Sequence, residues 1–372
     1  MLEEQKVRLG VVGLGVMGSI HAKTVLTGKV ERCELAAISD IVPTTGKEFP
    51  EIPFFNSARD MIDSGLIDAL LIATPHFDHT KIGIYALEYG LHVLVEKPIS
   101  VHKADCQKLL NSHKSQEQVF AAMFNQRTNP SYIRLHDLIT SGDLGEIRRI
   151  NWIVTDWFRT HAYYAASNWR ATWAGEGAGV LLNQSPHQLD LWQWLFGMPI
   201  QLRAFCHRGR FHNIEVEDDV TAYMQYENGA TGIFITTTGE APGTNRLEIA
   251  AENGKIVIET NKMIWTRNTI PTSHFSKEAD KGFAKPDTET IDLSVEDTGL
   301  EHVGIIINFV EAILDDIPLI APASEGIHSV ELANAILYSG LNDKSIKLPL
   351  DAEKYECFLN GLIASSSYLV GS

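Results

Sequence analysis

The sequence predicts an α/β fold of two domains, in which a doubly wound parallel sheet precedes an α+β domain built on a mostly antiparallel, open sheet. In the first third of the chain, short runs of β-branched and apolar residues alternate with helical stretches, as in parallel sheets that helices cover on both faces. Farther along, strands come in pairs joined by Asn-Gly turns, which are typical of hairpins. The length of 372 residues also exceeds that of most single cores, so two domains are expected.

The first domain is expected over residues 1–125, as a Rossmann sheet. Each of its strands is a short apolar run followed by a helical stretch, which is the rhythm of βαβ units. The strands are predicted at 7–13, 35–40, 69–73, 92–96 and 119–123.

The second domain is expected over residues 126–372. Ser141-Gly142 closes a helix there and begins the change of pattern, and Asn228-Gly229 and Asn253-Gly254 mark two hairpins. Its strands are predicted at 146–156, 220–226, 230–238, 246–251 and 255–259. Helical patterns at 301–314, 324–341 and 352–365 either cover this sheet or return to the first domain, and the sequence does not choose between these arrangements.

Composition excludes several classes of function. A formal net charge of −16 opposes binding to nucleic acid, which needs clustered cations against the phosphate backbone. No apolar run has the length of a membrane span, and the charged residues 1–8 lack the apolar stretch of a signal peptide. The four cysteines lie far apart without CxxC spacing, as expected of reduced thiols, so a cytoplasmic protein is predicted.

A glycine-rich turn follows the first predicted strand and opens a helix. Gly13, Gly15 and Gly18 form a GxGxxG sequence around Val16 and Met17. In this context the first glycine permits the tight turn, the second lets the backbone approach a pyrophosphate, and the third allows close helix packing. These residues are predicted to bind a dinucleotide.

Asp40 ends the second predicted strand, at the distance from the glycines where a carboxylate accepts from a ribose 2′-hydroxyl. The same carboxylate would repel a 2′-phosphate, so the expected cofactor is NAD rather than NADP. The alternative is that Asp40 merely caps the next turn.

Beyond the glycines, three segments carry a family resemblance: Thr74-Pro75 with His79, Glu96-Lys97-Pro98, and Asn125-Gln126-Arg127. With the downstream segment 169–197, they resemble the glucose-fructose oxidoreductase and inositol dehydrogenase (Gfo/Idh/MocA) family of oxidoreductases. The resemblance implies that the second domain binds substrate and forms a homodimer or homotetramer. It also implies cofactor contacts from Thr74, Pro75, His79, Glu96, Lys97 and Asn125.

The resemblance assigns catalysis to Lys97 and His187. An ammonium group at Lys97 would stabilise negative charge on a reacting oxygen, and the imidazole of His187 would exchange a proton. Asn183 stands where many family members carry an Asp, so it is assigned to substrate positioning. Asp190 either orients His187 or makes a structural contact, and the sequence leaves both open.

Aromatic residues interleaved with arginine fill the stretch 156–173, which is typical of a sugar pocket. Arg127, Tyr163 and Trp169 are therefore predicted to contact substrate, although core packing or a subunit interface explains such aromatics equally well. No metal is expected, because His76 and His79 have no third ligand nearby and hydride transfer requires none.

The leading functional prediction is an NAD-dependent dehydrogenase that oxidises a secondary hydroxyl of a sugar, sugar derivative or inositol. One alternative keeps NAD bound in a redox-neutral cycle, as in sugar oxidoreductases or redox-assisted glycoside cleavage. Another is a non-catalytic sensor of nucleotide or sugar, because the resembled family includes a transcriptional co-repressor.

Overall fold

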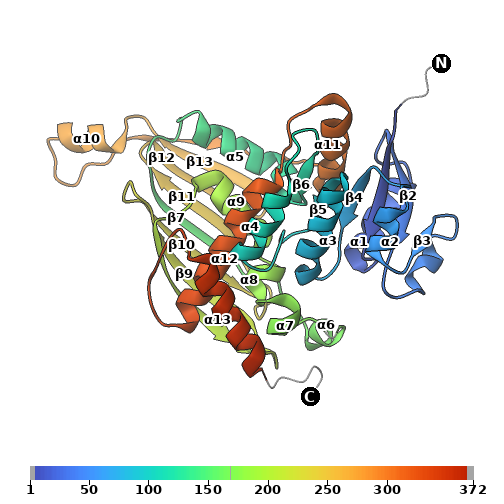
Figure 1. The fold of residues 1–372 in the computed structure, drawn as a ribbon. Coiled ribbons are helices and arrows are strands. Elements are labelled where there is room, and N and C mark those ends of the chain that lie inside the picture. Colours follow the sequence, from blue (N-terminus) through green and yellow to red (C-terminus); the bar gives the residue numbers. More distant parts are fainter. Residues whose placement is uncertain (1–4, 168, 367–372) are drawn as a thin grey trace.

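The computed structural model describes residues 5–167 and 169–366, which form two sheets with their helices (Figure 1). The first sheet is parallel and has six strands. In spatial order they are β3 (Phe54–Phe55), β2 (Cys33–Ser39), β1 (Val7–Val12), β4 (Ala69–Ile72), β5 (His92–Val95) and β6 (Phe120–Ala122). This order confirms the predicted doubly wound sheet, and it reverses direction between β1 and β4, where such sheets bind ligands.

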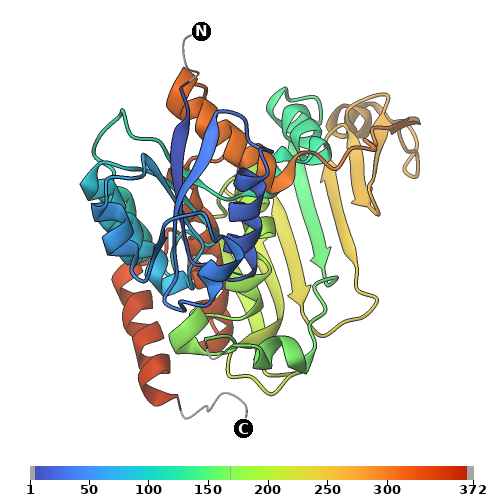
Figure 2. The ribbon, with the colours of Figure 1, turned by 90° about the vertical axis from the view of Figure 1, so that its right-hand side faces the viewer.

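Helices cover both faces of the first sheet (Figure 2). The helices from the first part of the chain are α1 (Val16–Leu26), α2 (Ala58–Asp63), α3 (His76–Tyr89) and α4 (Lys103–Ser112), together with the 3-10 turn η1 (Thr45–Glu48). A fifth helix, α11 (Glu301–Asp315), comes from far along the chain and packs on the same core through Ile306 and Phe309.

The second sheet has nine strands, and all but one of its pairings are antiparallel. The order is β14 (Thr288–Asp292), β13 (Lys262–Asn268), β12 (Gly254–Glu259), β11 (Asn245–Ala251), β7 (Ile147–Val154), β10 (Thr231–Thr237), β9 (Glu217–Gln225), β8 (Gln201–Arg208) and β15 (Ile346–Lys347). Both predicted Asn-Gly hairpins are confirmed, as the pairs β9–β10 and β11–β12. At the centre, β7 and β10 pair in parallel.

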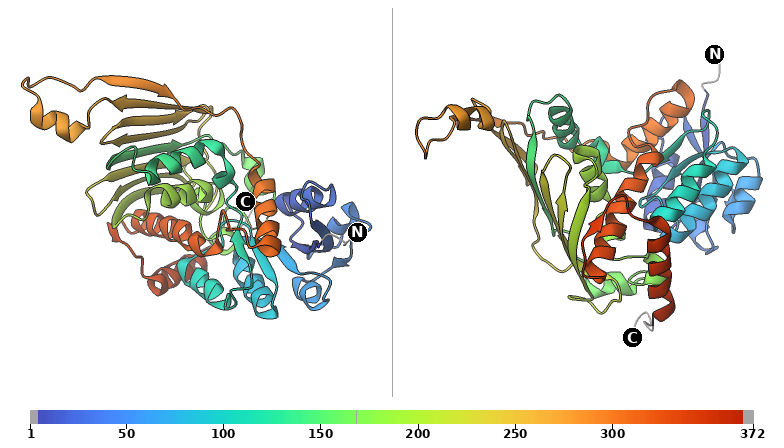
Figure 3. Two further views of the ribbon diagram at one scale, coloured as in Figure 1. Left: turned by 90° about the horizontal axis from the view of Figure 1, so that it is seen from above. Right: turned by 60° about the vertical axis from the view of Figure 1, so that its left-hand side comes forward.

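One face of the second sheet carries helices and the other does not, within the described residues (Figure 3). The longer helices of this domain are α5 (Pro130–Thr140), α9 (Pro186–Phe196), α12 (Gly326–Leu341) and α13 (Ala352–Ser365). The uncovered face exposes Phe205 and Tyr223, whereas the covered face buries Trp152 and Phe234 in the second hydrophobic core. A short helix, α10 (Thr272–Glu278), lies between β13 and β14.

Three short helices connect β7 to α9: α6 (His161–Ala165), α7 (Trp173–Glu176) and α8 (Val180–Asn183). Two 3-10 turns, η2 (Asn125–Thr128) and η3 (Ala323–Glu325), lie where the chain passes between the two cores. A buried ion pair of 2.8 Å between Lys103 Nζ on α4 and Glu331 Oε1 on α12 also joins them. The short helix α7 packs against α3, which begins just after β4 at the carboxyl edge of the parallel sheet.

Candidate active site

The glycine turn between β1 and α1 has the geometry that its sequence predicts. Gly13 has a φ of +86°, and a Cβ atom there would lie 2.7 Å from the backbone of Ala73 at the end of β4. A Cβ atom on Gly18 would lie 1.7 Å from the carbonyl oxygen of Gly13. Any side chain at either position would therefore displace the backbone and open the turn.

Gly15 differs from its neighbours because a Cβ atom there would meet nothing within 4 Å. It is the N-cap of α1, so the backbone N–H groups of Val16 and Met17 in the first turn have no partner within the helix. Free N–H groups and the helix dipole favour an anion at this end. The open space at Gly15 thus fits a phosphate group.

Asp40 ties the turn to the end of β2. Its Oδ2 accepts a hydrogen bond of 2.6 Å from the backbone N–H of Leu14, and its Oδ1 accepts one of 2.8 Å from that of Val42. The capping contact that the sequence left open is therefore present. Each carboxylate oxygen retains a lone pair, so a contact with a ribose hydroxyl is compatible with both bonds.

Two buried polar atoms lie unpartnered at the carboxyl ends of β4 and β6. Thr74 Oγ1 and Asn125 Oδ1 are both shielded from solvent and have no hydrogen-bond partner among the described residues. Pro75, beside Thr74, is the N-cap of α3. Because a buried polar atom without a partner is costly, these positions fit a ligand that supplies hydrogen bonds.

His79 and Glu96, both predicted to contact the cofactor, form hydrogen bonds within the protein. The ring nitrogens of His79 lie 2.9 Å from the carbonyl oxygen of Pro98 and 2.8 Å from that of Thr74. Glu96 Oε1 contacts His21 Nε2 at 2.7 Å, and its Oε2 accepts from the N–H of Lys97 at 3.0 Å. Burial alone would raise the pKa of Glu96, but the hydrogen bond and charge of His21 lower it to about 2. Through Pro98 and the N–H of Lys97, both residues hold the backbone of the Lys97 segment in place.

Lys97 follows β5 at the same edge of the sheet, and its bond to Pro98 is cis. Its Nζ donates a hydrogen bond of 2.8 Å to the carbonyl oxygen of Asn183 on α8. Burial lowers the pKa of Lys97, and the charges of Arg159 and Arg170 lower it further. The ammonium group is thus held beside the second domain with two of its three N–H bonds available.

His187 lies in the first turn of α9, and it is partly buried. Its Nδ1 has no hydrogen-bond partner in the described part of the chain, and its ring stacks on Trp157 with centroids 6.4 Å apart. Burial lowers the pKa of His187 well below its ordinary value, and the charge of Lys97 adds to this effect. The imidazole is therefore neutral near pH 7 and able to accept a proton.

Asp190 does not orient His187, and Arg127 is turned away from the predicted substrate contact. Arg127 donates to both carboxylate oxygens of Asp190, at 2.8 and 2.6 Å, and to Glu325 at 2.5 Å. The Arg127 side chain is 1% exposed. These bonds engage its guanidinium in a buried network, which identifies Asp190 as a structural contact and corrects the prediction that Arg127 binds substrate.

Asn183 belongs to a hydrogen-bond network that the sequence did not reveal. Its amide Nδ2 donates to Glu176 Oε1, and its Oδ1 accepts from the hydroxyl of Tyr163 at 3.4 Å. Glu176 Oε2 also accepts from the N–H of Ala171 at 2.9 Å, and burial raises the pKa of Glu176 to about 7. The only sequence signal for Glu176 was a carboxylate within a glycine-rich stretch. A titratable group thus lies behind the amide that stands in place of the usual Asp.

Two arginines enclose the ring of Tyr163. The guanidinium carbons of Arg159 and Arg170 lie 5.0 and 4.7 Å from its centroid. Arg170 also lies 4.6 Å from the ring centre of Trp169, which meets His76 edge-on at 5.4 Å. The predicted substrate residues Tyr163 and Trp169 are therefore brought to the Lys97 edge, whereas Arg127 is not.

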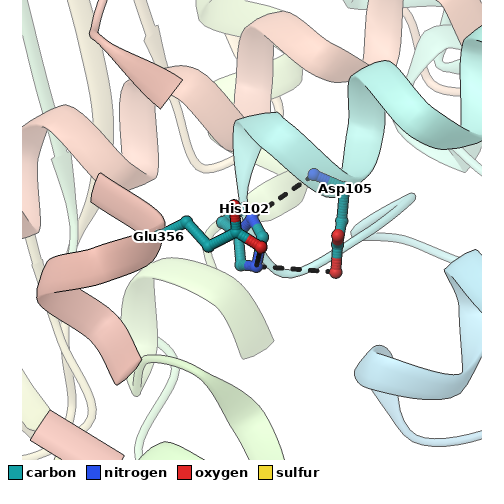
Figure 4. A group of neighbouring side chains, drawn as sticks. All are labelled: His102, Asp105 and Glu356. Carbon is teal, nitrogen blue, oxygen red and sulfur yellow. Dashed lines mark hydrogen bonds and ion pairs between the residues drawn. The ribbon is translucent and has the colours of Figure 1, made fainter. Parts of the chain in front are cut away.

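A group of one histidine and two carboxylates lies elsewhere, between α4 and α13 (Figure 4). The ligand atoms of His102, Asp105 and Glu356 lie within 4.8 Å of one another. Lys108 already bridges the two carboxylates, at 2.8 Å from Asp105 and 3.2 Å from Glu356. The positive charge between them is thus supplied by the protein.

Comparison with known proteins agrees with this arrangement. Residues 7–124 match the model of an oxidoreductase family with an NAD-binding Rossmann fold, and residues 132–257 match the GFO/IDH/MocA C-terminal domain. The chain belongs to the Gfo/Idh/MocA family of oxidoreductases. The predicted family is confirmed.

Individual family members are distant in sequence. The rhizopine catabolism protein MocA of Rhizobium meliloti is 26% identical over 88% of this chain and 93% of its own. Inositol 2-dehydrogenase 1 of Saccharopolyspora erythraea is 27% identical, but the alignment spans only 55% of this chain and 58% of that enzyme. The solved WlbA dehydrogenase from Bordetella pertussis, in complex with NADH and UDP-GlcNAcA, is 25% identical and covers 93% of this chain and 100% of its own, with a TM-score of 0.77.

No helix among the described residues combines the length and apolar character needed to cross a membrane. The four cysteines Cys33, Cys106, Cys206 and Cys357 are unpaired thiols, as predicted.

Proposed function

We propose that this family member is an NAD-dependent dehydrogenase that oxidises a secondary hydroxyl of a sugar, sugar derivative or inositol. The observation that carries the proposal is the hydrogen bond of 2.8 Å from Lys97 Nζ, at the carboxyl edge of the parallel sheet, to the carbonyl oxygen of Asn183, four residues before His187. The charge of Lys97 also contributes to lowering the pKa of His187. A neutral imidazole beside an ammonium group suits removal of a hydroxyl proton.

The chain's own groups fit NAD at this edge. The open position at Gly15 and the first turn of α1 would hold the pyrophosphate, with Asp40 at the ribose. Thr74 Oγ1 and Asn125 Oδ1 are unpartnered acceptors that the cofactor would satisfy. When bound, NAD supplies the acceptor for a hydride.

The roles of the protein groups follow from their bonds. An N–H of Lys97 Nζ that is not used by Asn183 would donate to the reacting oxygen and stabilise it as its proton leaves. His187 would accept that proton on a ring nitrogen. Asn183, fixed between Glu176 and Tyr163, would position a second hydroxyl.

The assay is a panel of inositols, aldoses and anhydrosugars, each mixed with NAD and followed by nicotinamide absorbance. Reduction of NAD by at least one polyol is expected. NAD binding without turnover of any polyol would favour a sensor, and absorbance from NAD that survives extensive dialysis would favour a cofactor that is retained in a redox-neutral cycle.

The uncovered face of the nine-stranded sheet supports a homo-oligomer. Phe205 is 56% and Tyr223 40% exposed there, and large exposed apolar side chains on a flat sheet suit an interface. Sedimentation that shows only monomer would contradict this.

A further inference from the structure

Two arginines at the site lack the carboxylate partner that the protein gives its other inward-facing arginines. Five arginines that are buried or partly buried each form an ion pair: Arg8, Arg32, Arg127, Arg203 and Arg246. Arg159 and Arg170 are also partly buried, and neither has an ion pair within the described residues. In a chain with 47 acidic and 31 basic residues, this absence is not due to a shortage of carboxylates.

The two guanidinium groups have unused donors. Arg159 Nη1 donates to the carbonyl oxygen of Phe158 at 2.9 Å, but its Nε is buried without a partner. Arg170 Nη1 is likewise buried without a partner. Burying a cation with unsatisfied N–H groups is costly unless an anion completes them.

The nearby carboxylates are engaged elsewhere, and neither forms an ion pair with Arg159 or Arg170 in the described part of the chain. Glu96 holds His21, and Glu176 accepts from Asn183 and from the N–H of Ala171. Both arginines flank the ring of Tyr163, whose hydroxyl donates to Asn183, and the carbonyl oxygen of Asn183 accepts from Lys97 Nζ. Three cationic side chains therefore lie around one hydrogen-bonded group.

Arg159 is linked to His187 through a single aromatic ring. Its guanidinium carbon is 5.5 Å from the centre of Trp157, whose ring stacks on His187. Arg170 instead stacks on Trp169, which contacts His76 at the start of α3. An anion bound to Arg159 would therefore lie close to the molecule that His187 deprotonates. An anion bound to Arg170 would lie nearer to the start of α3.

We propose that the polyol oxidised at this site is anionic and that Arg159 binds its charged group, the carboxylate of a sugar acid or the phosphate of a sugar phosphate. A guanidinium presents two parallel N–H donors to either group. The inference rests on the proposed dehydrogenase function and names its class of substrate.

The test compares each acid with its neutral parent, using glucuronate, galacturonate and glucose 6-phosphate against glucose and galactose. We expect kcat/KM to be at least tenfold higher for one of the anions. Arg159→Gln should abolish that preference by raising KM for the anion, with the Kd of NAD nearly unchanged. Arg134→Gln, which removes an exposed arginine of α5, is the matched control and should change neither.

Several results would overturn the proposal. Among these are a preference for the neutral sugars, an equal loss for acid and neutral sugar in Arg159→Gln, and a weakened NAD titration that accounts for the whole effect. The last result would assign the anion to the cofactor. Whether the uronate or the phosphate is preferred identifies the charged group.

Failure of the proposed function is distinguished by equilibrium binding. If no polyol is oxidised, calorimetric titration of glucuronate and glucose 6-phosphate into the protein with NADH still measures recognition of the anion. Binding that Arg159→Gln weakens at least tenfold supports the anion site in a protein that is not a dehydrogenase. No binding of either anion contradicts the site itself.

Discussion

Two arginines are linked to residues of helix α9, and they differ in their partners. Arg127 is 1% exposed and bonds to Asp190 and Glu325. Arg159 lies against Trp157, whose ring stacks on His187, and has a buried donor without a partner among the described residues. Both are cations in the same acidic chain, so residue type alone does not separate them.

The difference separates groups that hold the fold from groups that await a ligand. A buried cation paired with carboxylates of the chain fixes one helix to its neighbours, whereas a partly buried cation with an unpartnered donor has room to bind a ligand. The sequence predicted Arg127 as a substrate-binding residue, whereas the hydrogen bonds of the two arginines favour Arg159 for that role.

The largest effect is expected when one of the two proposed catalytic residues is removed. Lys97→Ala or His187→Ala should lower kcat by roughly two to four orders of magnitude, the usual scale for a positioned acid/base or oxyanion donor. NAD titration should be nearly unchanged, because the glycine turn is untouched. The double variant should lose less than the product of the single losses. A folded variant with wild-type kcat at saturating NAD and substrate would show that the residue has another role.

Removing the arginine that is paired with Asp190 should instead reduce the stability of the fold. Arg127→Ala leaves Asp190 buried without its partner, which costs about 3–5 kcal/mol in the free energy of unfolding, measured with urea. The matched control is Arg267→Ala on β13, whose pair with Glu289 is about half exposed and should contribute less than about 1 kcal/mol. Equal losses in the two variants would contradict the structural role of Arg127.

The next prediction concerns Asp40, whose carboxylate can still accept a hydrogen bond from a ligand. Its bonds to Leu14 and Val42 leave lone pairs for a ribose hydroxyl, and its charge would repel a 2′-phosphate. Asp40→Ala should narrow the preference for NAD over NADP by about tenfold in kcat/KM, since one charged hydrogen bond is lost. A wild type that already uses NADP more efficiently would show that Asp40 only caps the turn.

The smallest effect concerns pH. Oxidation needs neutral His187, whose pKa lies below 6.5, and protonated Lys97, whose pKa lies below 10.5, so kcat/KM should rise and then fall with pH. Because the charge of Arg159 lowers the pKa of Lys97, Arg159→Gln should raise that pKa and move the alkaline limb to higher pH. An unchanged alkaline limb would mean that the charge of Arg159 does not affect the pKa of Lys97.

The sequence predicted the parts of the fold that depend on local turns and periodicity. Gly13 requires a left-handed backbone, and both Asn-Gly pairs close the hairpins that they predicted. The parallel pairing of β7 with β10 was not predictable, because it joins strands that are far apart in sequence and depends on the packing of the whole domain.

Within the site, the sequence and the resemblance led to Lys97 and His187, but they did not give the partners of buried charges. Asp190 lies three residues from His187 on one helix, yet its carboxylate meets Arg127 from another element. Glu176 meets Asn183 only because α7 and α8 turn back on each other through glycines. Such contacts are fixed by tertiary packing rather than by spacing along the chain.

Helix α11 has a consequence for how this protein is made. The core of the parallel sheet includes Ile305, Ile306, Phe309 and Val310, which follow the whole of the nine-stranded sheet except β15. N-terminal domains commonly fold first as the chain leaves the ribosome. Here about four fifths of the protein must be synthesised before α11 completes the core of the first sheet, so we expect the nascent Rossmann portion to depend on chaperones until α11 emerges.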